Sequence, residues 1–217
     1  MSVCCLSVVA PLYAFLGNHQ TSLPPFKDHK PNYQNNTKCK FLNPTKPELG
    51  KLSKFITDRI NTVLRAKLKL NQLRNGEDLK TWFTKLPMKH KQKFIQLDIV
   101  AFYPSITEEL FKEVIEWAKQ HTEITEEEEE ILFQSKKSFL FNKDEPWKKK
   151  TESYFDVTQG SLDGAETCEL VGLYLLFKLQ KLGLEVAVYR DDGLAACKFS
   201  PQKTENIKRK YVPYLKI

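Results

Sequence analysis

Two adjacent carboxylates, Asp191 and Asp192, stand between two short apolar runs near the end of the sequence. The runs at 185–188 and 194–197 predict a strand, a turn and a second strand. Aspartate is depleted from strands and neighbouring like charges repel, so the pair costs stability unless Gly193 turns the chain and a cation neutralises the charge. The pair therefore predicts a metal site that needs a further acidic partner.

Asp98 is the expected partner, because it ends a largely apolar run, 93–99, that predicts a strand buried on both faces. Two Mg²⁺ ions about 3.5 to 4 Å apart can promote phosphoryl transfer if carboxylates from separate strands converge on them. Mg²⁺ takes hard oxygen ligands, so the lack of a histidine cluster is consistent with this chemistry. Asp98 and Asp191 would bridge the ions, with Asp192 auxiliary. Taken singly, each acid also fits a strand end or a solvated turn.

The segment before this strand predicts two helices. Apolar residues recur at helical spacing from Pro47 to about Leu70, with Pro47 at the first helical position. Asp78 is expected to cap a shorter helix. Two aromatic residues of this shorter helix, Trp82 and Phe83, are expected to lie in the core rather than to stack on bases. The same is expected of Trp117, farther along the chain.

Capping boxes mark the start of two helices after the strand. Ser105 with Glu108 predicts the first, and Thr125 with Glu128 predicts the second, which would run to about Phe139.

The last part of the sequence predicts two hairpins separated by a helix. Residues 139–141 and 154–157 flank a lysine-rich stretch that reads as a long basic tip, in which 148–150 could touch phosphate. An apolar helix at 165–182 ends at Gly183. The order of elements indicates an α+β fold, a small antiparallel sheet backed by helices, with Asp98 and the aspartate turn at one edge.

Charge is distributed unevenly along the chain. Residues 1–97 hold 17 Lys and Arg against 5 Asp and Glu, whereas residues 98–217 hold 17 against 22. A basic half followed by an acidic half favours a polyanion-binding surface next to a cation site, as a nucleic-acid enzyme needs, although solvated lysine-rich helices would give the same count.

The five cysteines are odd in number and lack C-x-x-C spacing, so the sequence favours neither a disulfide framework nor a zinc site. An intracellular location, nuclear or cytoplasmic, is the default expectation. The apolar start at 3–16 lacks a basic flank and is interrupted by Pro11, which argues against a signal peptide. No other segment approaches the length of a membrane span.

Three motifs in order resemble those of reverse transcriptases. The stretch 98–106, DIVAFYPSI, resembles motif A; Thr158-Gln159-Gly160-Ser161 resembles the Gln-Gly element of motif B; and Tyr189-Arg190-Asp191-Asp192 resembles the Y-x-D-D motif C. The basic stretch 38–44 is similar to the fingers of retroelement polymerases. The resemblance covers roughly 38–199 and implies a polymerase palm preceded by basic, largely helical fingers.

The resemblance assigns a metal site and its cofactor. Asp98, Asp191 and Asp192 would be the catalytic carboxylates that bind two Mg²⁺ ions, and the backbone carbonyl of Ile99 would join them. The partners would be an RNA template, a DNA primer and deoxynucleoside triphosphates, with no membrane.

The resemblance also assigns a nucleotide pocket. Tyr103 lies where the family places an aromatic gate against the ribose 2′-hydroxyl, and Gln159 and Gly160 would border the nucleotide. Gly160 also fits an ordinary turn before a helix. Lys38 and Lys40 would contact the triphosphate. The cations of the helix after Pro47 (Lys and Arg at 51–69) would follow template phosphates without sequence preference.

The pattern departs from the family in three places. Arg190 occupies a position where a neutral side chain is commoner. Motif B runs Ser161-Leu162-Asp163-Gly164 rather than the frequent Ser-Pro ending, and 25 residues follow Asp192, too few for a thumb. We therefore expect a poorly defined segment at 1–37, a fingers-like region at 38–92, and a palm at 93–217 that lacks a thumb.

Three functions remain open on the sequence. The chain resembles an RNA-directed DNA polymerase core, but it could instead be a non-catalytic nucleic-acid-binding remnant of such a polymerase. An RNA-templated RNA polymerase would also pair an aspartate strand with an aspartate turn, although Tyr103 argues against it.

Overall fold

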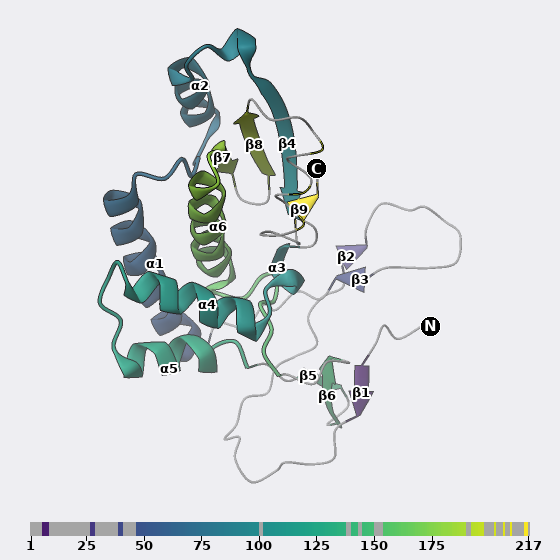
Figure 1. Ribbon diagram of the computed structural model, residues 1–217. Helices are drawn as coiled ribbons and strands as arrows, with labels where there is room; N and C mark the ends of the chain where they lie inside the picture. Colours follow the sequence, from purple (N-terminus) through teal and green to yellow (C-terminus); the bar gives the residue numbers. More distant parts are fainter. Residues whose placement is uncertain are drawn as a thin grey trace.

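The computed structural model describes residues 6–8, 27–28, 39–40, 47–99, 102–137, 140–142, 145–149, 154–189, 192–197, 202, 206, 209 and 215–216. Within these ranges the helices are α1 Glu48–Leu68, α2 Gly76–Lys85, α3 Phe102–Ser105, α4 Glu108–Lys119, α5 Glu126–Gln134 and α6 Gly164–Lys181, with a 3₁₀ turn η1 at Lys89–Lys91 (Figure 1). The strands are β1 Leu6–Val8, β2 Lys27–Asp28, β3 Cys39–Lys40, β4 Lys93–Ile99, β5 Leu140–Asn142, β6 Glu145–Lys149, β7 Glu185–Tyr189, β8 Asp192–Cys197 and β9 Leu215–Lys216.

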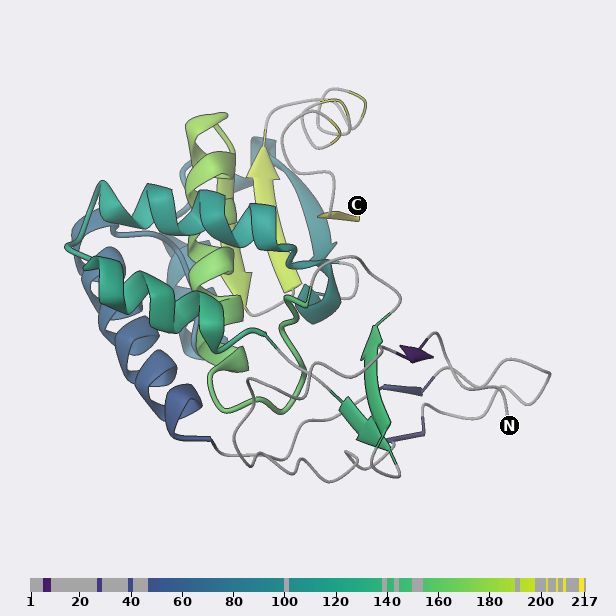
Figure 2. The ribbon, with the colours of Figure 1, turned by 90° about the horizontal axis from the view of Figure 1, so that it is seen from below.

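Helix α6 lies at the centre of the packed core. It contacts α1, α4 and β7, and both views show α1 on one side of it and the strands β8 and β4 on the other (Figures 1 and 2). Its buried residues occupy every face of the helix, including the run Leu170 to Leu176. A helix that is apolar all round is stable only when it is enclosed, so the α6 sequence requires layers on both sides.

The sheet next to α6 has the strand order β7-β8-β4-β9, and each pair of neighbouring strands in it is antiparallel. Alternate residues of β4 point to opposite faces. Ile95 and Leu97 pack into the core that includes α6, while Phe94 and Gln96 are exposed. The expectation that this strand is buried on both faces is therefore wrong, and one face of its first half meets solvent.

Helix α2 covers part of that second face. Trp82 of α2 and its C-cap residue Leu86 form a small buried cluster with Ala187 of β7 and Ala196 of β8. The small alanine side chains let the helix approach the strands closely. The prediction that Trp82 and Trp117 are core residues is confirmed, since both are buried, but Phe83 is exposed.

The helix boundaries confirm some predicted caps and correct others. Thr125 and Glu128 form the expected capping box at the start of α5. The cap of α4 is Thr107 rather than Ser105, whose hydroxyl donates to the carbonyl of Phe102 within α3. The cap of α2 is Asn75, which accepts from the backbone N–H of Asp78.

Helix α1 and helix α5 also differ from their predicted bounds. Pro47 is the N-cap of α1 rather than its first helical residue, with extended backbone at ψ 151°. Helix α5 ends at Gln134 instead of Phe139.

The lysine-rich stretch is a strand and not the tip of a long hairpin. Strand β6, which contains Lys148 and Lys149, pairs with β5 on one side and with β1 on the other. The expected strand at 154–157 makes one isolated bridge, from Phe155 to Lys137. The partner of this stretch is at the far end of the sequence, so local pattern could not reveal it.

The described elements form an α+β fold with helices against a small antiparallel sheet, as the sequence predicts. Among the described residues, no helix combines the length and apolar character needed to cross a membrane.

Candidate active site

The strands that carry motifs A and C lie side by side at the centre of the sheet. In the register of β4 with β8, Asp98 is directly opposite Asp192. Tyr189 is opposite Asp192 on the other side, and Lys216 is opposite Asp98. One row of positions across four strands therefore contains Tyr189, Asp192, Asp98 and Lys216.

This register joins two of the three predicted carboxylate positions. Asp192 is exposed at the first position of β8. Asp191 and Arg190 lie outside the described residues, so the predicted pairing of Asp98 with Asp191 stays a prediction. Ile99 follows Asp98 as the last residue of β4 and is opposite Leu215.

Gly193 has a different role from the turn predicted for it. It lies inside β8, opposite Leu97 and Val188. A Cβ atom at this position would come within 3.2 Å of Leu97 Cβ and 3.6 Å of Val188 Cγ2. Glycine is therefore needed for close approach of three strands next to the aspartate row.

Motif B forms a tight turn immediately before α6. The backbone N–H of Ser161 donates to the carbonyl of Thr158 at 3.1 Å, and Gly160 has φ +90°. A positive φ at the third residue of such a turn favours glycine. The turn accounts for Gly160 without a ligand, and it presents Gln159 and Gly160 to solvent.

Tyr103 lies against this turn. It belongs to α3, is half-buried, and packs against the main core. A Cβ atom at Gly164 would lie 3.2 Å from Tyr103 Cε1 and 2.6 Å from Ser161 Oγ, so Gly164 admits the tyrosine ring beside the start of α6. The fold thus brings the predicted gate of motif A next to motif B.

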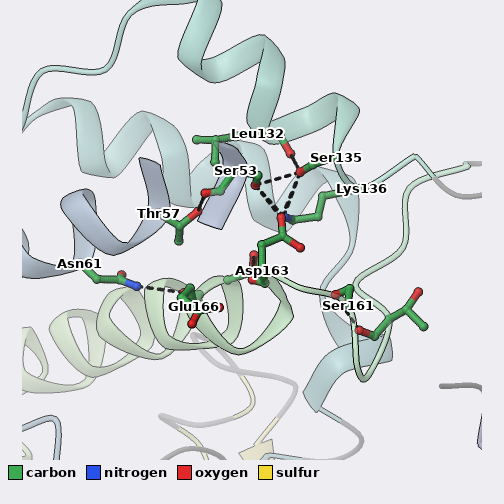
Figure 3. A network of polar contacts seen from close by, with 11 residues as sticks. Ser53, Thr57, Asn61, Leu132, Ser135, Lys136, Ser161, Asp163 and Glu166 are labelled. Carbon is green, nitrogen blue, oxygen red and sulfur yellow. Dashed lines mark hydrogen bonds and ion pairs between the residues drawn. The ribbon is translucent and has the colours of Figure 1, made fainter. Parts of the chain in front are cut away.

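A buried ion pair holds the chain at the same junction (Figure 3). Lys136, with 2% of its surface exposed, donates to the carboxylate of Asp163, the N-cap residue of α6. Ser53 of α1 donates to the same carboxylate at 2.5 Å, and Ser135 contacts it at 3.1 Å. Burial lowers the pKa of Lys136, and the attraction of Asp163 opposes that shift.

Sequence reasoning missed this ion pair. Lys136 stands in the ordinary-looking run Ser135-Lys136-Lys137, and Asp163 appeared only as a departure from a family pattern. The departure was the one available signal, because a charged residue in an otherwise apolar context needs a partner when it is buried.

The structure describes only some of the basic residues predicted to bind phosphates. Lys38 lies outside the described residues, and Lys40 pairs with Lys27 between β3 and β2. Cations of α1 contact acids of the protein itself: Lys54 with Glu166, Arg65 with Glu169, and Arg59 with Glu128 at 2.6 Å. Those three cations help to pack α1 onto α5 and α6. That the cations of α1 follow template phosphates stays a prediction.

The described residues contain no group of three or more His, Cys, Asp and Glu side chains close enough to hold a metal ion. The three predicted carboxylates cannot be judged by this, since the side chain of Asp98 and all of Asp191 are outside the description.

Comparison with known proteins gives a match in structure but none in sequence. No protein-family model matches the chain, and no curated protein matches it. The structure is similar to that of apo telomerase from Candida tropicalis truncated from its C-terminal domain, with a TM-score of 0.60 and 14% sequence identity.

That similarity covers 97% of this chain and 50% of the telomerase chain, so the protein spans about half the length of this structural neighbour. At this level of identity the match concerns the fold alone. It shows that the chain has a fold similar to that of this telomerase structure.

Proposed function

We propose that the chain is the core of an RNA-directed DNA polymerase of the retroelement type. The observation that carries the proposal is the register that sets Asp98 of motif A directly opposite Asp192 of motif C. Carboxylates from separate strands at one end of a sheet are the arrangement that two-metal nucleotidyl transfer needs. The telomerase-like fold is consistent with it.

In the proposed reaction the 3′-hydroxyl oxygen of a DNA primer forms a bond to the α-phosphorus of a deoxynucleoside triphosphate. The bond from that phosphorus to the bridging oxygen breaks, the hydroxyl loses its proton, and pyrophosphate leaves. Asp98, Asp191, Asp192 and the carbonyl of Ile99 would hold Mg²⁺, for which oxygen donors fit. When bound, Mg²⁺ supplies activation of the attacking oxygen and stabilisation of the leaving one.

The residues around this row give the proposed pocket its selectivity. Tyr103 would lie beneath the sugar and exclude a ribose 2′-hydroxyl, and its packing against the start of α6 supports a fixed ring position. Gln159 and Gly160 would border the incoming nucleotide on the exposed turn. Lys38 and Lys40 would contact the triphosphate.

Primer extension on an RNA template with deoxynucleotides tests the proposal. Extension should require a divalent metal and be lost in Asp98→Asn and in Asp191→Asn, whereas Asp58→Asn, an exposed acid of α1, should keep it. Undiminished extension by either site variant would refute the proposed metal site. Tyr103→Ala should increase the use of ribonucleotides, and no increase would refute the gate.

The alternative, a non-catalytic nucleic-acid-binding remnant, predicts a different result. The unmodified protein would bind a primer-template at low salt and give no extension with any metal. Binding measured beside extension therefore separates the two functions.

A further inference from the structure

Three large apolar side chains are exposed in the segment from Phe83 in α2 to Phe94 in β4. Phe83 is 41% exposed, Met88 51% and Phe94 41%. The rings of Phe83 and Phe94 have centroids 5.5 Å apart and planes inclined by 38°. We call this group, with the lysines around it, the Phe83–Phe94 surface; exposed apolar groups that touch one another mark interaction sites more often than scattered ones do.

Packing inside the protein does not account for these two rings. The apolar side of α2 is already satisfied by Trp82 and Leu86, which are buried against the sheet. On β4 the core is reached by Ile95 and Leu97, and Phe94 has the opposite orientation. The rings contact each other, and each is 41% exposed, so part of each ring is available to a ligand.

The chain segment that carries both rings has one sign of charge, although the exposed Glu185 of β7 lies in the same row of the sheet as Phe94, beyond Ala196. From Leu79 to Leu97 the sequence has no acidic residue and five lysines: Lys80, Lys85, Lys89, Lys91 and Lys93. Lys89 lies over the Phe83 ring, with Nζ 5.1 Å from its centroid. Lys85, Lys91 and Lys93 are exposed, and none has an acidic partner among the residues that the structure describes.

Bases and phosphates together match this combination. Exposed aromatic rings provide stacking faces for unpaired bases, and neighbouring lysines attract the phosphates, which is the usual composition of a site for single strands. A duplex offers no free base faces to the rings. An acidic protein would use the lysines, but it would not need two aromatic rings side by side.

We propose that the Phe83–Phe94 surface binds single-stranded nucleic acid by stacking bases on the two rings and pairing phosphates with the lysines. The inference rests on the proposed function only for its biological use, since a polymerase must hold an unpaired template; the binding itself needs no catalysis.

The surface is placed so that a bound strand could reach the aspartate row. Phe94 is opposite Ala196 on β8, and Asp192 lies four residues before Ala196 on that strand. Alternate residues share a face, so Phe94 and Asp192 lie on the same face of the sheet, about 13 Å apart along it at 3.3 Å per residue. A strand held by the rings would extend across the open half of this face.

Binding of a fluorescent oligo(dT) or oligo(rU) strand, followed by anisotropy, tests the proposal with the full chain. Phe83→Ala combined with Phe94→Ala should weaken binding at least about fivefold, the lower end of the stacking contribution of one base. Phe55→Ala, which removes a 71% exposed ring from α1, is the matched control and should change nothing. Thermal unfolding of each variant checks that it folds.

Two further variants separate stacking and charge from other contacts. Phe83→Leu with Phe94→Leu keeps apolar area without an aromatic face, so it should bind as weakly as the alanine pair. Lys91→Gln with Lys93→Gln should reduce the slope of log affinity against log salt by about 1.4, since each phosphate contact to a single strand contributes about 0.7.

Unchanged affinity in the alanine pair, or full binding by the leucine pair, would refute the proposal. So would loss of self-association or of binding to anionic vesicles on Phe83→Ala without loss of strand binding. Asp98→Asn should still bind single strands, because the proposed surface does not include Asp98. If the unmodified protein binds single strands but does not extend a primer, the proposed function is refuted and the proposed surface is not. If the unmodified protein extends a primer but the alanine pair binds single strands with unchanged affinity, only the proposed surface is refuted.

Discussion

Helix α1 and the segment from Lys80 to Lys93 are both rich in cations, but the structure uses these charges differently. In α1, cations contact acids of α5 and α6, as in the pair of Lys54 with Glu166. In the second segment, the exposed lysines have no such partner in the described part of the chain, apart from Lys80, which is 3.9 Å from Glu77. A net charge counted along the sequence therefore does not show which cations a polyanion can reach.

The difference arises from what each segment packs against. Helix α1 lies on α5 and α6, and these helices carry their acids toward it, including Glu128 from the acidic run at the start of α5. Helix α2 lies on the sheet through Trp82 and two alanines, which supply no charge. The lysines beyond α2 therefore keep their charge available.

The largest change in stability is expected for the buried ion pair of Lys136 with Asp163, which contacts Ser53 of α1. Lys136→Met would leave the carboxylate of Asp163 buried with only hydroxyl partners such as Ser53, so unfolding should become easier by about 3 to 5 kcal/mol. Lys136→Met with Asp163→Leu should recover most of that stability, because no charge is then left unpaired.

Urea unfolding of these variants measures the change. Lys137→Met, at the exposed neighbouring position, is the matched control and should be within about 0.5 kcal/mol of the unmodified protein. A loss below about 1 kcal/mol in Lys136→Met would show that the pair does not hold this junction.

A second prediction would abolish the contrast between the two cationic regions. Glu128→Gln, Glu166→Gln and Glu169→Gln together would release Arg59, Lys54 and Arg65. Each lost pair should cost about 0.2 to 1 kcal/mol, since all are partly exposed. Binding of single strands should become tighter and its salt slope steeper by up to about 2.1.

Anisotropy titrations at several salt concentrations measure that slope. Glu116→Gln, which loses its contact with Lys119 on α4, is a control that removes charge without releasing α1. An unchanged slope in the triple variant would mean that the cations of α1 do not face bound nucleic acid even when they are free.

The smallest effect is expected for the stability of the Phe83–Phe94 surface itself. Phe94→Ala should change the free energy of unfolding by about 1 kcal/mol or less, because the ring is 41% exposed and its ring contact is with Phe83, which is also 41% exposed. Phe111→Ala, which removes a fully buried ring, should cost about 3 to 5 kcal/mol in the same unfolding experiment. A comparable loss in both would make Phe94 a core residue.

Much of the fold could be predicted from local pattern. The periodicity of α1, the capping box of Thr125 with Glu128, and the stop of α6 at Gly183, which has φ +77°, depend on residues within a few positions of one another. The predicted cap was wrong where two candidate residues lie close together, as with Ser105 and Thr107. Which of the two hydroxyls faces the helix end depends on where the preceding turn finishes.

The pairing of the two strands that carry the predicted site was predictable from the sequence, but the neighbours of those strands were not. Motif order indicated that the strand of Asp98 would meet the aspartate hairpin, and the register sets Asp98 opposite Asp192. The role of Gly193 was misread, because its close neighbours are on other strands: Leu97 lies about a hundred positions earlier in the chain. The pairing of β6 with β1 was missed for the same reason.

The sequence by itself determined the longer helices, the strands that carry Asp98 and Asp192, and which residue types could bind metal, since propensity, periodicity and motif order are local or ordered along the chain. Tertiary structure alone decided which charges are neutralised, which rings are exposed, and which lysine is buried with Asp163. Coulomb attraction and apolar burial act over a few ångströms in space, and only the packing of distant segments brings such groups within that range.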